Sequence, residues 1–325
     1  MSQGEFDLIA RYFTFPTTIG RWTSQGPGDD CALIALGERT LAITTDMMAI
    51  GTHFLPDVSP YTMGRKALAV NLSDLAAAGA APRAFFLSLS LPRRDDAWLA
   101  EFRRGLLAMA ESYGCALLGG DTVKAPEGAP VSLSITAIGE MPAGKGLTRQ
   151  GARPGDDVWV TGTPGDAYAA LMMRTGEWPV LTDVEARRAL EVRMDDPTPR
   201  VSLGERLRGV AHAAVDVSDG LLQDLGHILE RSGVGAEIYW SACPRSEALS
   251  RFSEEAQRRA VLGGGDDYEL VFCVAPQDRA AIERLGDETG VRVTRIGRIA
   301  GEGLTVRNAE GEPLPVGTYG FDHFA

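Results

Sequence analysis

The chain has 325 residues, with 32 Lys and Arg against 44 Asp and Glu, so its formal net charge is −12. This length predicts about two domains, and 44% hydrophobic with 23% charged residues is ordinary for a folded globular protein. The negative charge argues against proteins that coat nucleic acids or anionic membranes, because both partners are polyanions. It leaves open acidic substrates held through metal ions, because bound cations reverse the local charge.

Cysteine usage and the N-terminus favour a cytoplasmic location. The four cysteines, Cys31, Cys115, Cys243 and Cys273, are far apart and form no CxxC pair, which favours reduced thiols. The first 13 residues lack the basic start and apolar stretch of a signal peptide. No apolar run reaches the roughly 18 residues that span a bilayer. We therefore expect neither a membrane segment nor a membrane or nucleic-acid partner.

The first half of the chain mixes helical and alternating apolar patterns. The spacing of Phe6, Ile9, Ala10 and Phe13 predicts a short opening helix. The elements expected after it, in chain order, are strands over 31–36 and 40–46, a helix over 61–80, a strand over 83–91, a helix over 95–113, and strands over 116–118 and 131–140.

A linker turn with the sequence Gly-Ala-Arg-Pro-Gly occupies 151–155 and separates two sets of elements. The elements expected beyond it are a strand over 157–161, helices over 166–175 and 184–194, a strand over 212–217, a helix over 219–232, a strand over 268–274, a helix over 277–289 and a strand over 291–299. We place the domain boundary at residue 148, which gives domains 1–148 and 149–325.

Aspartates next to glycines recur along the chain. Gly-Asp-Asp occurs at 28–30, 155–157 and 265–267, and related sites lie at 71–74, 120–121 and 216–220. Most are expected where a strand ends or a helix begins, which is where α/β proteins bind ligands. Glycine lets a ligand approach the backbone, and Asp supplies the hard oxygen ligands that Mg²⁺ prefers. Converging carboxylates would repel one another without cations between them, so the pattern favours a metal–nucleotide enzyme.

Each motif has a simpler explanation when it is taken alone. Asp and Gly are routine turn residues, and Asp is a common helix N-cap. Asp156 and Asp157 keep this interpretation, as a turn that enters a strand. Asp219 could likewise cap the helix expected to begin at Gly220. The functional interpretation of the others depends on their joint pattern.

That joint pattern resembles the thiamine-monophosphate kinase family of the aminoimidazole-ribonucleotide-synthetase-like superfamily. The matching segments run in order along nearly the whole chain: 4–6, 28–32, 44–46, 51–54, 66–76, 119–122, 147–149, 151–156, 216–221, 264–270 and 320–324. The Asp-rich motifs are shared with the wider superfamily. His53 in Gly-Thr-His-Phe and the terminal Gly-Phe-Asp-His-Phe are typical of the kinase.

The resemblance implies a two-domain PurM-like fold. Its N-terminal α/β domain carries a mixed sheet that pairs with a second copy in a homodimer, and its C-terminal domain is α+β. It also implies a reaction in which ATP and thiamine monophosphate give ADP and thiamine diphosphate. A terminal phosphate is already a nucleophile, so no covalent catalytic residue is expected. Gly144-Lys145 is followed by Gly146, so a Walker A motif is absent and several Mg²⁺ ions are expected to take its place.

The resemblance also implies the site residues. The implied metal ligands are Asp30, Thr44, Thr45, Asp46, Asp74, Asp121, Asp216 and Asp219, with Asp29 a further candidate. The implied ATP contacts are Tyr113, Gly120, Asp121, Arg149 and Ser218, and the implied thiamine-phosphate contacts are His53, Asp266 and Phe321. Simpler roles stay open for four of these residues. Arg149 could be a surface arginine and His53 an ordinary loop histidine, while Tyr113 and Phe321 could serve only in packing.

Position 266 departs from the family pattern, which has Glu where this chain has Asp266. The charge is kept but the side chain is one methylene shorter, so a water molecule or a shifted substrate would have to bridge the gap. Two other functions stay open: another ATP-dependent member of the superfamily, such as an aminoimidazole ribonucleotide synthetase or a hydrogenase-maturation dehydratase, and a catalytically silent nucleotide- or thiamine-binding regulator.

Overall fold

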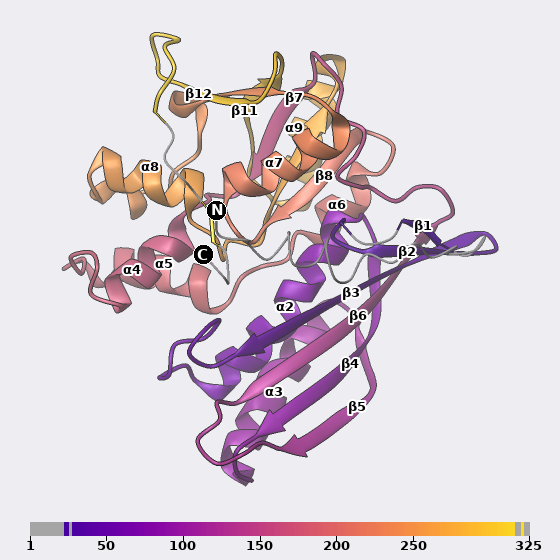
Figure 1. Cartoon of the computed structure of the whole chain (residues 1–325), viewed down its shortest axis with the longest axis vertical. Coiled ribbons are helices and arrows are strands. Elements are labelled where there is room, and N and C mark those ends of the chain that lie inside the picture. The colour runs from indigo at the N-terminus through magenta and orange to yellow at the C-terminus, as the bar shows by residue number, and fades with distance from the viewer. Residues whose placement is uncertain (1–22, 26–27, 316–319, 322–325) are drawn as a thin grey trace.

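A computed structural model describes residues 23–25, 28–315 and 320–321. Within these ranges the chain forms two six-stranded sheets, one in each half, with helices packed around them (Figure 1). This confirms the predicted two-domain α/β and α+β fold. The helix expected over 6–13 lies outside the described residues.

The first sheet is mixed, as expected. Its order is β1-β2-β3-β6-β4-β5, and only the β4–β5 pair is parallel. A parallel neighbour requires a crossover, which a helix between β4 and β5 supplies. The strands are β1 (Thr23–Gln25), β2 (Ala32–Leu36), β3 (Arg39–Ala49), β4 (Ala81–Leu91), β5 (Ala116–Lys124) and β6 (Ser132–Pro142).

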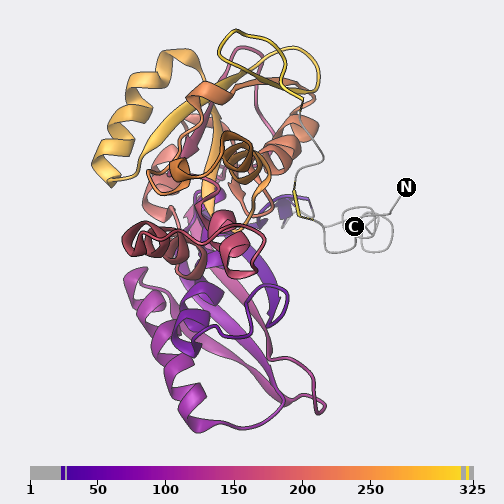
Figure 2. The same ribbon diagram turned by 90° about the vertical axis from the view of Figure 1, so that its left-hand side faces the viewer.

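Two long helices, α2 (Pro60–Ala77) and α3 (Asp96–Ser112), cover one face of this sheet (Figures 1 and 2). The Ser59 side chain caps α2 by accepting the Thr62 N–H, with Pro60 at the first helical position. The helices touch through glycines: a Cβ on Gly105 would lie 1.8 Å from the carbonyl oxygen of Tyr61. A Cβ on Gly64 would lie 2.2 Å from the carbonyl oxygen of Phe102, so the two backbones are in direct contact.

The second sheet has the order β12-β9-β11-β7-β10-β8 and is antiparallel except for the β12–β9 pair. Its strands are β7 (Asp157–Thr161), β8 (Ala211–Val217), β9 (Ala236–Tyr239), β10 (Glu269–Val274), β11 (Val293–Ile299) and β12 (Leu304–Arg307). The helices of this half are α4 (Asp166–Arg174), α5 (Val184–Asp195), α6 (Val201–Leu207), α7 (Leu221–Ser232), α8 (Glu254–Gly263) and α9 (Arg279–Thr289). Short 3₁₀ turns cover Trp240–Ala242, Leu249–Arg251 and Pro276–Asp278.

Helix α2 lies between the two sheets. Its buried Leu68 and Leu72 belong to the same apolar cluster as Ile135 of β6 and Phe272 of β10. Alternate residues of β10 face the other way, so Val271 belongs to a second cluster beneath α4, α5, α7 and α8. The core of the first domain therefore continues across α2 into the second, and residues on α2 can reach both halves.

The structure extends several predicted elements and adds others. The strand expected over 116–118 continues to Lys124 because it pairs with β4 as far as Leu91. Gly120 and Asp121 therefore lie inside a strand and not beyond its end. The sequence analysis did not anticipate α6, α8, β9 and β12. Across the described residues, no helix combines the length and apolar character needed to cross a membrane.

Candidate active site

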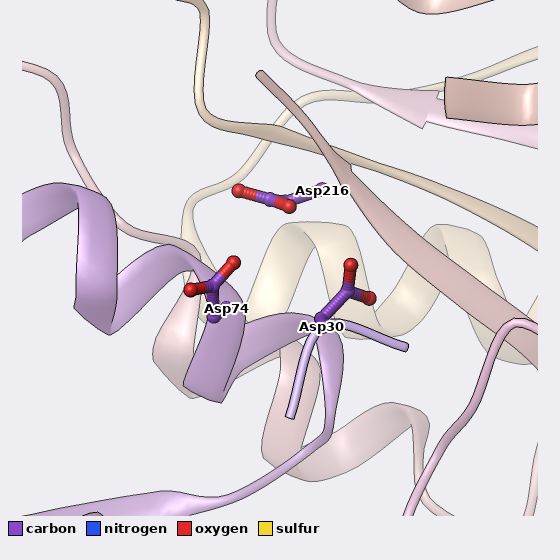
Figure 3. Close-up of side chains that lie close together, drawn as sticks. All are labelled: Asp30, Asp74 and Asp216. Carbon is purple, nitrogen blue, oxygen red and sulfur yellow. The ribbon is translucent and has the colours of Figure 1, made fainter. Parts of the chain in front are cut away.

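Three carboxylates from distant parts of the sequence converge where the two domains meet. Asp30 lies on the loop before β2, Asp74 lies on α2, and Asp216 lies near the end of β8. One carboxylate oxygen from each lies within 4.8 Å of the others. Figure 3 shows the three carboxylates turned towards a common space. We refer to Asp30, Asp74 and Asp216 as the acidic cluster.

Neighbouring side chains hold the acidic cluster in place. Ser73 Oγ donates to Asp216 Oδ2 at 2.6 Å, and the Thr44 hydroxyl donates to Asp74. The Arg149 guanidinium donates to Asp30 Oδ1 from Nε at 3.0 Å and from a terminal nitrogen at 2.6 Å. The other Asp30 oxygen is buried and has no hydrogen-bond partner among the described residues. An orphaned buried carboxylate oxygen that faces two further carboxylates is a fitting ligand for a cation.

The electrostatics of the acidic cluster also favour a bound cation. Burial, with the Asp30 charge adding to it, raises the pKa of Asp216 to about 8. Burial together with Asp46 and Asp216 raises the pKa of Asp74 well above its usual range. The pKa of the adjacent Asp46 rises to about 6, again mainly through burial. Each shift reports the free-energy cost of ionising closely spaced carboxylates in a low dielectric, and a divalent cation between them would reverse it.

The acidic cluster opens into a cavity of about 1110 Å³. Asp74 and Asp216 line the cavity, and Asp30 lies next to both of them just behind its wall. The cavity brings together most of the residues that the sequence analysis predicted: Thr45, Asp46, His53, Asp74, Asp216, Ser218, Asp219, Asp266 and Phe321. Segments from both domains therefore form one chamber, with the acidic cluster at one end.

A buried aspartate organises the loop between β8 and α7. Asp224 Oδ2 accepts the backbone N–H groups of Ser218, Asp219 and Gly220 at 3.0, 3.1 and 3.0 Å. The Asp219 side chain is not the cap of this helix, because the N-cap is Gly220. Asp224 takes up the N–H groups, which leaves the side chains of Ser218 and Asp219 to line the cavity.

The loop that precedes β10 has an unusual backbone. Asp266 and Tyr268 have φ values of 70° and 52°, in the left-handed region that non-glycine residues rarely adopt. Hydrogen bonds to the end of β8 hold them there: the Asp266 N–H donates to Ser218 at 2.7 Å and the Tyr268 N–H to Val217 at 2.8 Å. In this conformation successive side chains lie on alternate sides of the loop. Asp266 and Tyr268 line the cavity, while Asp267 and Glu269 are buried.

His53 and Phe321 lie on the same cavity but are held differently. His53 is half-buried, and its Nδ1 accepts the Ala49 N–H at 3.2 Å. Phe321 is half exposed. Its N–H donates to the Asp219 carbonyl at 3.1 Å, and its carbonyl accepts a hydrogen bond from Gln223 Nε2 at 3.0 Å. The Phe321 backbone is thus tied to the loop that carries Asp219, and its ring lines the cavity.

Other predicted site residues lie elsewhere. Asp121 is exposed on β5, in register with Ser88 of β4, Ser134 of β6 and Met47 of β3. Three strand spacings separate β5 from β3, which is about 14 Å. Gly120 adjoins Asp121 on the same strand, and the Tyr113 hydroxyl donates to Pro199 at 3.1 Å. One copy of the chain therefore does not bring Gly120, Asp121 or Tyr113 to the acidic cluster.

The middle Gly-Asp-Asp motif has the structural role that the sequence analysis favoured. Asp156 accepts the Arg153 N–H at 2.9 Å and contacts His212 at 2.8 Å, while Asp157 is paired with Arg279 and Arg295. All these contacts fix the start of the second sheet and lie outside the cavity.

Comparisons with known proteins agree with this architecture. Residues 28–141 match the N-terminal domain model of AIR synthase related proteins, and residues 153–307 match the C-terminal domain model. The chain is 44% identical over its full length to the thiamine-monophosphate kinase of Salmonella typhimurium strain LT2, covering 99% of that protein. The chain belongs to the thiamine-monophosphate kinase family.

Solved structures support the same family. The crystal structure of thiamine-monophosphate kinase from Stenotrophomonas maltophilia K279a is 43% identical, with a TM-score of 0.80 over 97% of this chain and 99% of that one. A structure described as AaThiL complexed with AMPPCP and TMP is 31% identical, with a TM-score of 0.84 over 99% of this chain and 97% of that one.

The sequence analysis of this thiamine-monophosphate kinase family member missed roles for Lys66 and Asp224. Lys66 stands in the motif over 66–76, and a lysine directly before the apolar run at 67–70 was a usable signal. Asp224 follows Asp219 within one and a half helical turns, but only the folded loop shows which N–H groups it accepts.

Proposed function

We propose that the protein transfers the γ-phosphoryl group of ATP to thiamine monophosphate, giving ADP and thiamine diphosphate, the last step of thiamine diphosphate biosynthesis. The observation that carries the proposal is the single cavity that joins the acidic cluster to His53, Asp266 and Phe321. The full-length similarity to thiamine-monophosphate kinases and the ligands of the AaThiL structure support it.

The acidic cluster supplies the charge that this reaction needs. Two anions must approach each other, so neutralisation and in-line positioning dominate the barrier. Magnesium ions held there would supply that neutralisation. We assign Asp30, Thr44, Thr45, Asp46, Asp74, Asp216 and Asp219 to this role, and no protein nucleophile takes part. Asp121, predicted with them, lies on β5 away from the acidic cluster and would join them only from a second copy of the chain.

The remaining predicted residues would position the two substrates. Arg149 has a fork geometry suited to phosphate, and it borders the acidic cluster through Asp30. We assign Arg149 and Ser218 to ATP. Gly120 and Asp121 would join them only from a second copy of the chain, and Tyr113, whose hydroxyl donates to Pro199, is assigned to packing. His53, Asp266 and Phe321 line the cavity and would contact thiamine monophosphate, whose thiazolium cation favours an aromatic face and a carboxylate.

We further infer that the protein works as a homodimer through its N-terminal domains. Strand β5 is the edge of the first sheet, and all nine of its residues are exposed, including Leu117, Leu118 and Val123. An exposed edge strand with apolar side chains is a site for association. Light scattering should give the mass of a dimer for the wild-type protein and of a monomer for Leu118→Asp. A monomeric wild-type protein would contradict this inference.

We also propose a domain boundary at residue 148 and a cytoplasmic location for the protein. The last strand of the first sheet ends at Pro142 and the next begins at Asp157, which supports a boundary at residue 148. All four cysteines are free and buried, as expected for a reducing cytoplasm.

The decisive experiment incubates the pure protein with MgATP and thiamine monophosphate and measures thiamine diphosphate by chromatography. We expect product formation that depends on both Mg²⁺ and thiamine monophosphate. Binding of both ligands without product over a range of Mg²⁺ and salt concentrations would instead indicate the catalytically silent regulator.

A further inference from the structure

The loop over residues 50–59 joins β3 to α2 and carries His53 on the cavity wall. We call it the His53 loop. Its backbone hydrogen bonds are local or stay within the first domain, as when the Gly51 N–H donates to the Phe54 carbonyl at 2.8 Å. Such bonds shape the loop but do not fix it against the second domain. Side-chain contacts across the domain boundary have to do so.

Leu55 and Asp57 of the His53 loop contact the second domain. Leu55 packs against the apolar cluster of that domain. Asp57 accepts a hydrogen bond from a terminal nitrogen of Arg174 at 2.6 Å. Arg174, the last residue of α4, also lies 3.3 Å from both carboxylate oxygens of Asp195, the last residue of α5. One guanidinium therefore joins the His53 loop to the ends of two helices.

The His53 loop and these two helices meet along one part of the cavity wall, because Leu55, Leu171 of α4 and Asp195 of α5 all line the cavity. Asp57 and Arg174 do not line it, and their side chains are 75% and 20% exposed. The ion pair therefore lies on the outer side of this wall and does not contact a substrate in the cavity. Any effect of the pair on activity would act through the loop.

Two further ion pairs join the domains nearby. Arg65 Nε lies 2.8 Å from Asp196 Oδ1, and Lys66 Nζ lies 2.5 Å from Asp266 Oδ2. Both pairs start from α2 and not from the His53 loop. Loss of the ion pair at Arg174 would therefore release the loop while α2 stays attached to the second domain.

We propose that Arg174 is a positioning residue that holds the His53 loop closed over the cavity for thiamine monophosphate, an inference that rests on the proposed function. An open loop would not present His53 to the substrate, so the apparent affinity would scale with the fraction of closed molecules. Ordering the loop in advance lowers the entropy cost of binding. Because bound substrate keeps the loop closed, kcat would not depend on the pair.

The test measures the steady-state kinetics of two variants. Arg174→Met loses two ion pairs and should raise KM for thiamine monophosphate by about 10-fold. Its kcat and its KM for ATP should stay within about twofold of wild type, which is the signature of lost binding without lost transition-state stabilisation. Asp57→Asn changes an exposed side chain and leaves Arg174 paired with Asp195, so KM should rise by only about threefold.

Three further variants separate positioning from a general effect on the fold. The double variant Asp57→Asn/Arg174→Met should match Arg174→Met alone, because the two residues act through one contact. Arg174→Lys keeps the charge and should recover most of the affinity. Arg206→Met is the matched control and should behave as wild type, because it breaks an exposed ion pair with Glu288 outside the cavity.

Two measurements do not depend on phosphoryl transfer. Calorimetry with thiamine monophosphate alone should show weaker binding by Asp57→Asn and Arg174→Met. Hydrogen exchange of peptides over residues 50–59 should be faster in both variants, with α2 exchanging as in wild type.

Three outcomes decide the proposal. Unchanged binding and unchanged exchange in the folded variants would overturn positioning by Arg174. A fall in kcat with an unchanged KM would overturn it as well, because closure would then not govern binding. Weaker binding of thiamine monophosphate by the variants, in a protein that forms no product, would contradict the kinase activity and support the positioning role.

Discussion

The two ends of the cavity use buried aspartates in opposite ways. At one end, Asp30, Asp74 and Asp216 face one another, and of these three carboxylates the Arg149 guanidinium donates to that of Asp30. At the other end, Asp266 has a buried lysine of its own, Lys66. Burial raises the pKa at both ends, but neighbouring carboxylates raise it further in the cluster, whereas Lys66 opposes the rise at Asp266.

The difference teaches that the partner of a buried carboxylate indicates its role. Three carboxylates that face one another with a single arginine beside them keep an excess of negative charge and are fitting ligands for a cation from solution. A carboxylate that is already neutralised has no such need and can serve as a hydrogen-bond acceptor for an organic ligand. Four predictions test this contrast.

The largest effect is expected at the acidic cluster. Asp74→Asn removes a charge that would hold magnesium, and kcat should fall by about 1,000-fold or more because the transferring phosphate loses electrostatic stabilisation. Steady-state kinetics with MgATP would measure it. Asp287→Asn, on the exposed surface of α9, is the matched control and should behave as wild type. Near-normal turnover in Asp74→Asn would remove the distinction between the two ends.

A smaller loss of activity is expected when Asp224, which holds the loop between β8 and α7, is removed. Asp224→Ala leaves the N–H groups of Ser218, Asp219 and Gly220 without their shared acceptor. Residues that orient metal ligands typically contribute 10- to 100-fold, so kcat/KM should fall by about that factor. The Mg²⁺ concentration at half-maximal rate should rise as well. A change in thermal stability without a change in Mg²⁺ dependence would show that Asp224 only supports the fold.

The pH dependence of stability should expose the acidic end without any substrate. The pKa of Asp216 is about 8 and that of Asp29 about 7 in the folded chain, both above the usual value of about 3.9. Unfolded chains therefore release these protons more readily, so metal-free protein should lose stability as the pH rises from about 4 towards 8. Calorimetry in chelator should show Tm falling over this range, and Mg²⁺ should restore more stability at pH 8 than at pH 6.

A matched variant isolates the contribution of the cluster to this slope. Asp216→Asn cannot ionise, so its Tm should fall less steeply between pH 6 and 8. An identical slope in the variant would place the pH dependence elsewhere in the molecule.

The smallest effect is expected at the other end of the cavity. Asp266→Glu keeps the charge and lengthens the side chain, so KM for thiamine monophosphate should be similar or lower, with any change below about threefold, or about 0.6 kcal/mol. Steady-state kinetics with varied thiamine monophosphate would measure it. A large rise in KM would indicate that the pairing with Lys66 is adapted to the shorter aspartate.

Much of this architecture could be predicted from local sequence. The two sets of elements and most of their helices and strands follow from apolar periodicity. The elements that were missed, β9 and β12 among them, are short, and β5 continues through Gly120 only because β4 lies beside it. Propensity and periodicity carry no information about such partners.

The candidate site shows the same limit more sharply. Motifs placed Asp30, Asp74 and Asp216 together by resemblance, and the structure brings them within 4.8 Å. The pairing of Lys66 with Asp266 joins residues 200 positions apart, so no local pattern could reveal it. The position of Asp121 could not be predicted either, because it depends on the order of strands within the sheet.

The glycine contact between α2 and α3 has a consequence for how such a cavity can change over evolution. Because Gly64 and Gly105 leave no room for a methyl group, any larger residue at either position would force α2 and α3 apart. Lys66 and Asp74, which both line the cavity, are carried by this one helix. A descendant that accepts a longer or shorter substrate would therefore have to remodel the loops of the second domain, while the spacing along α2 is inherited unchanged.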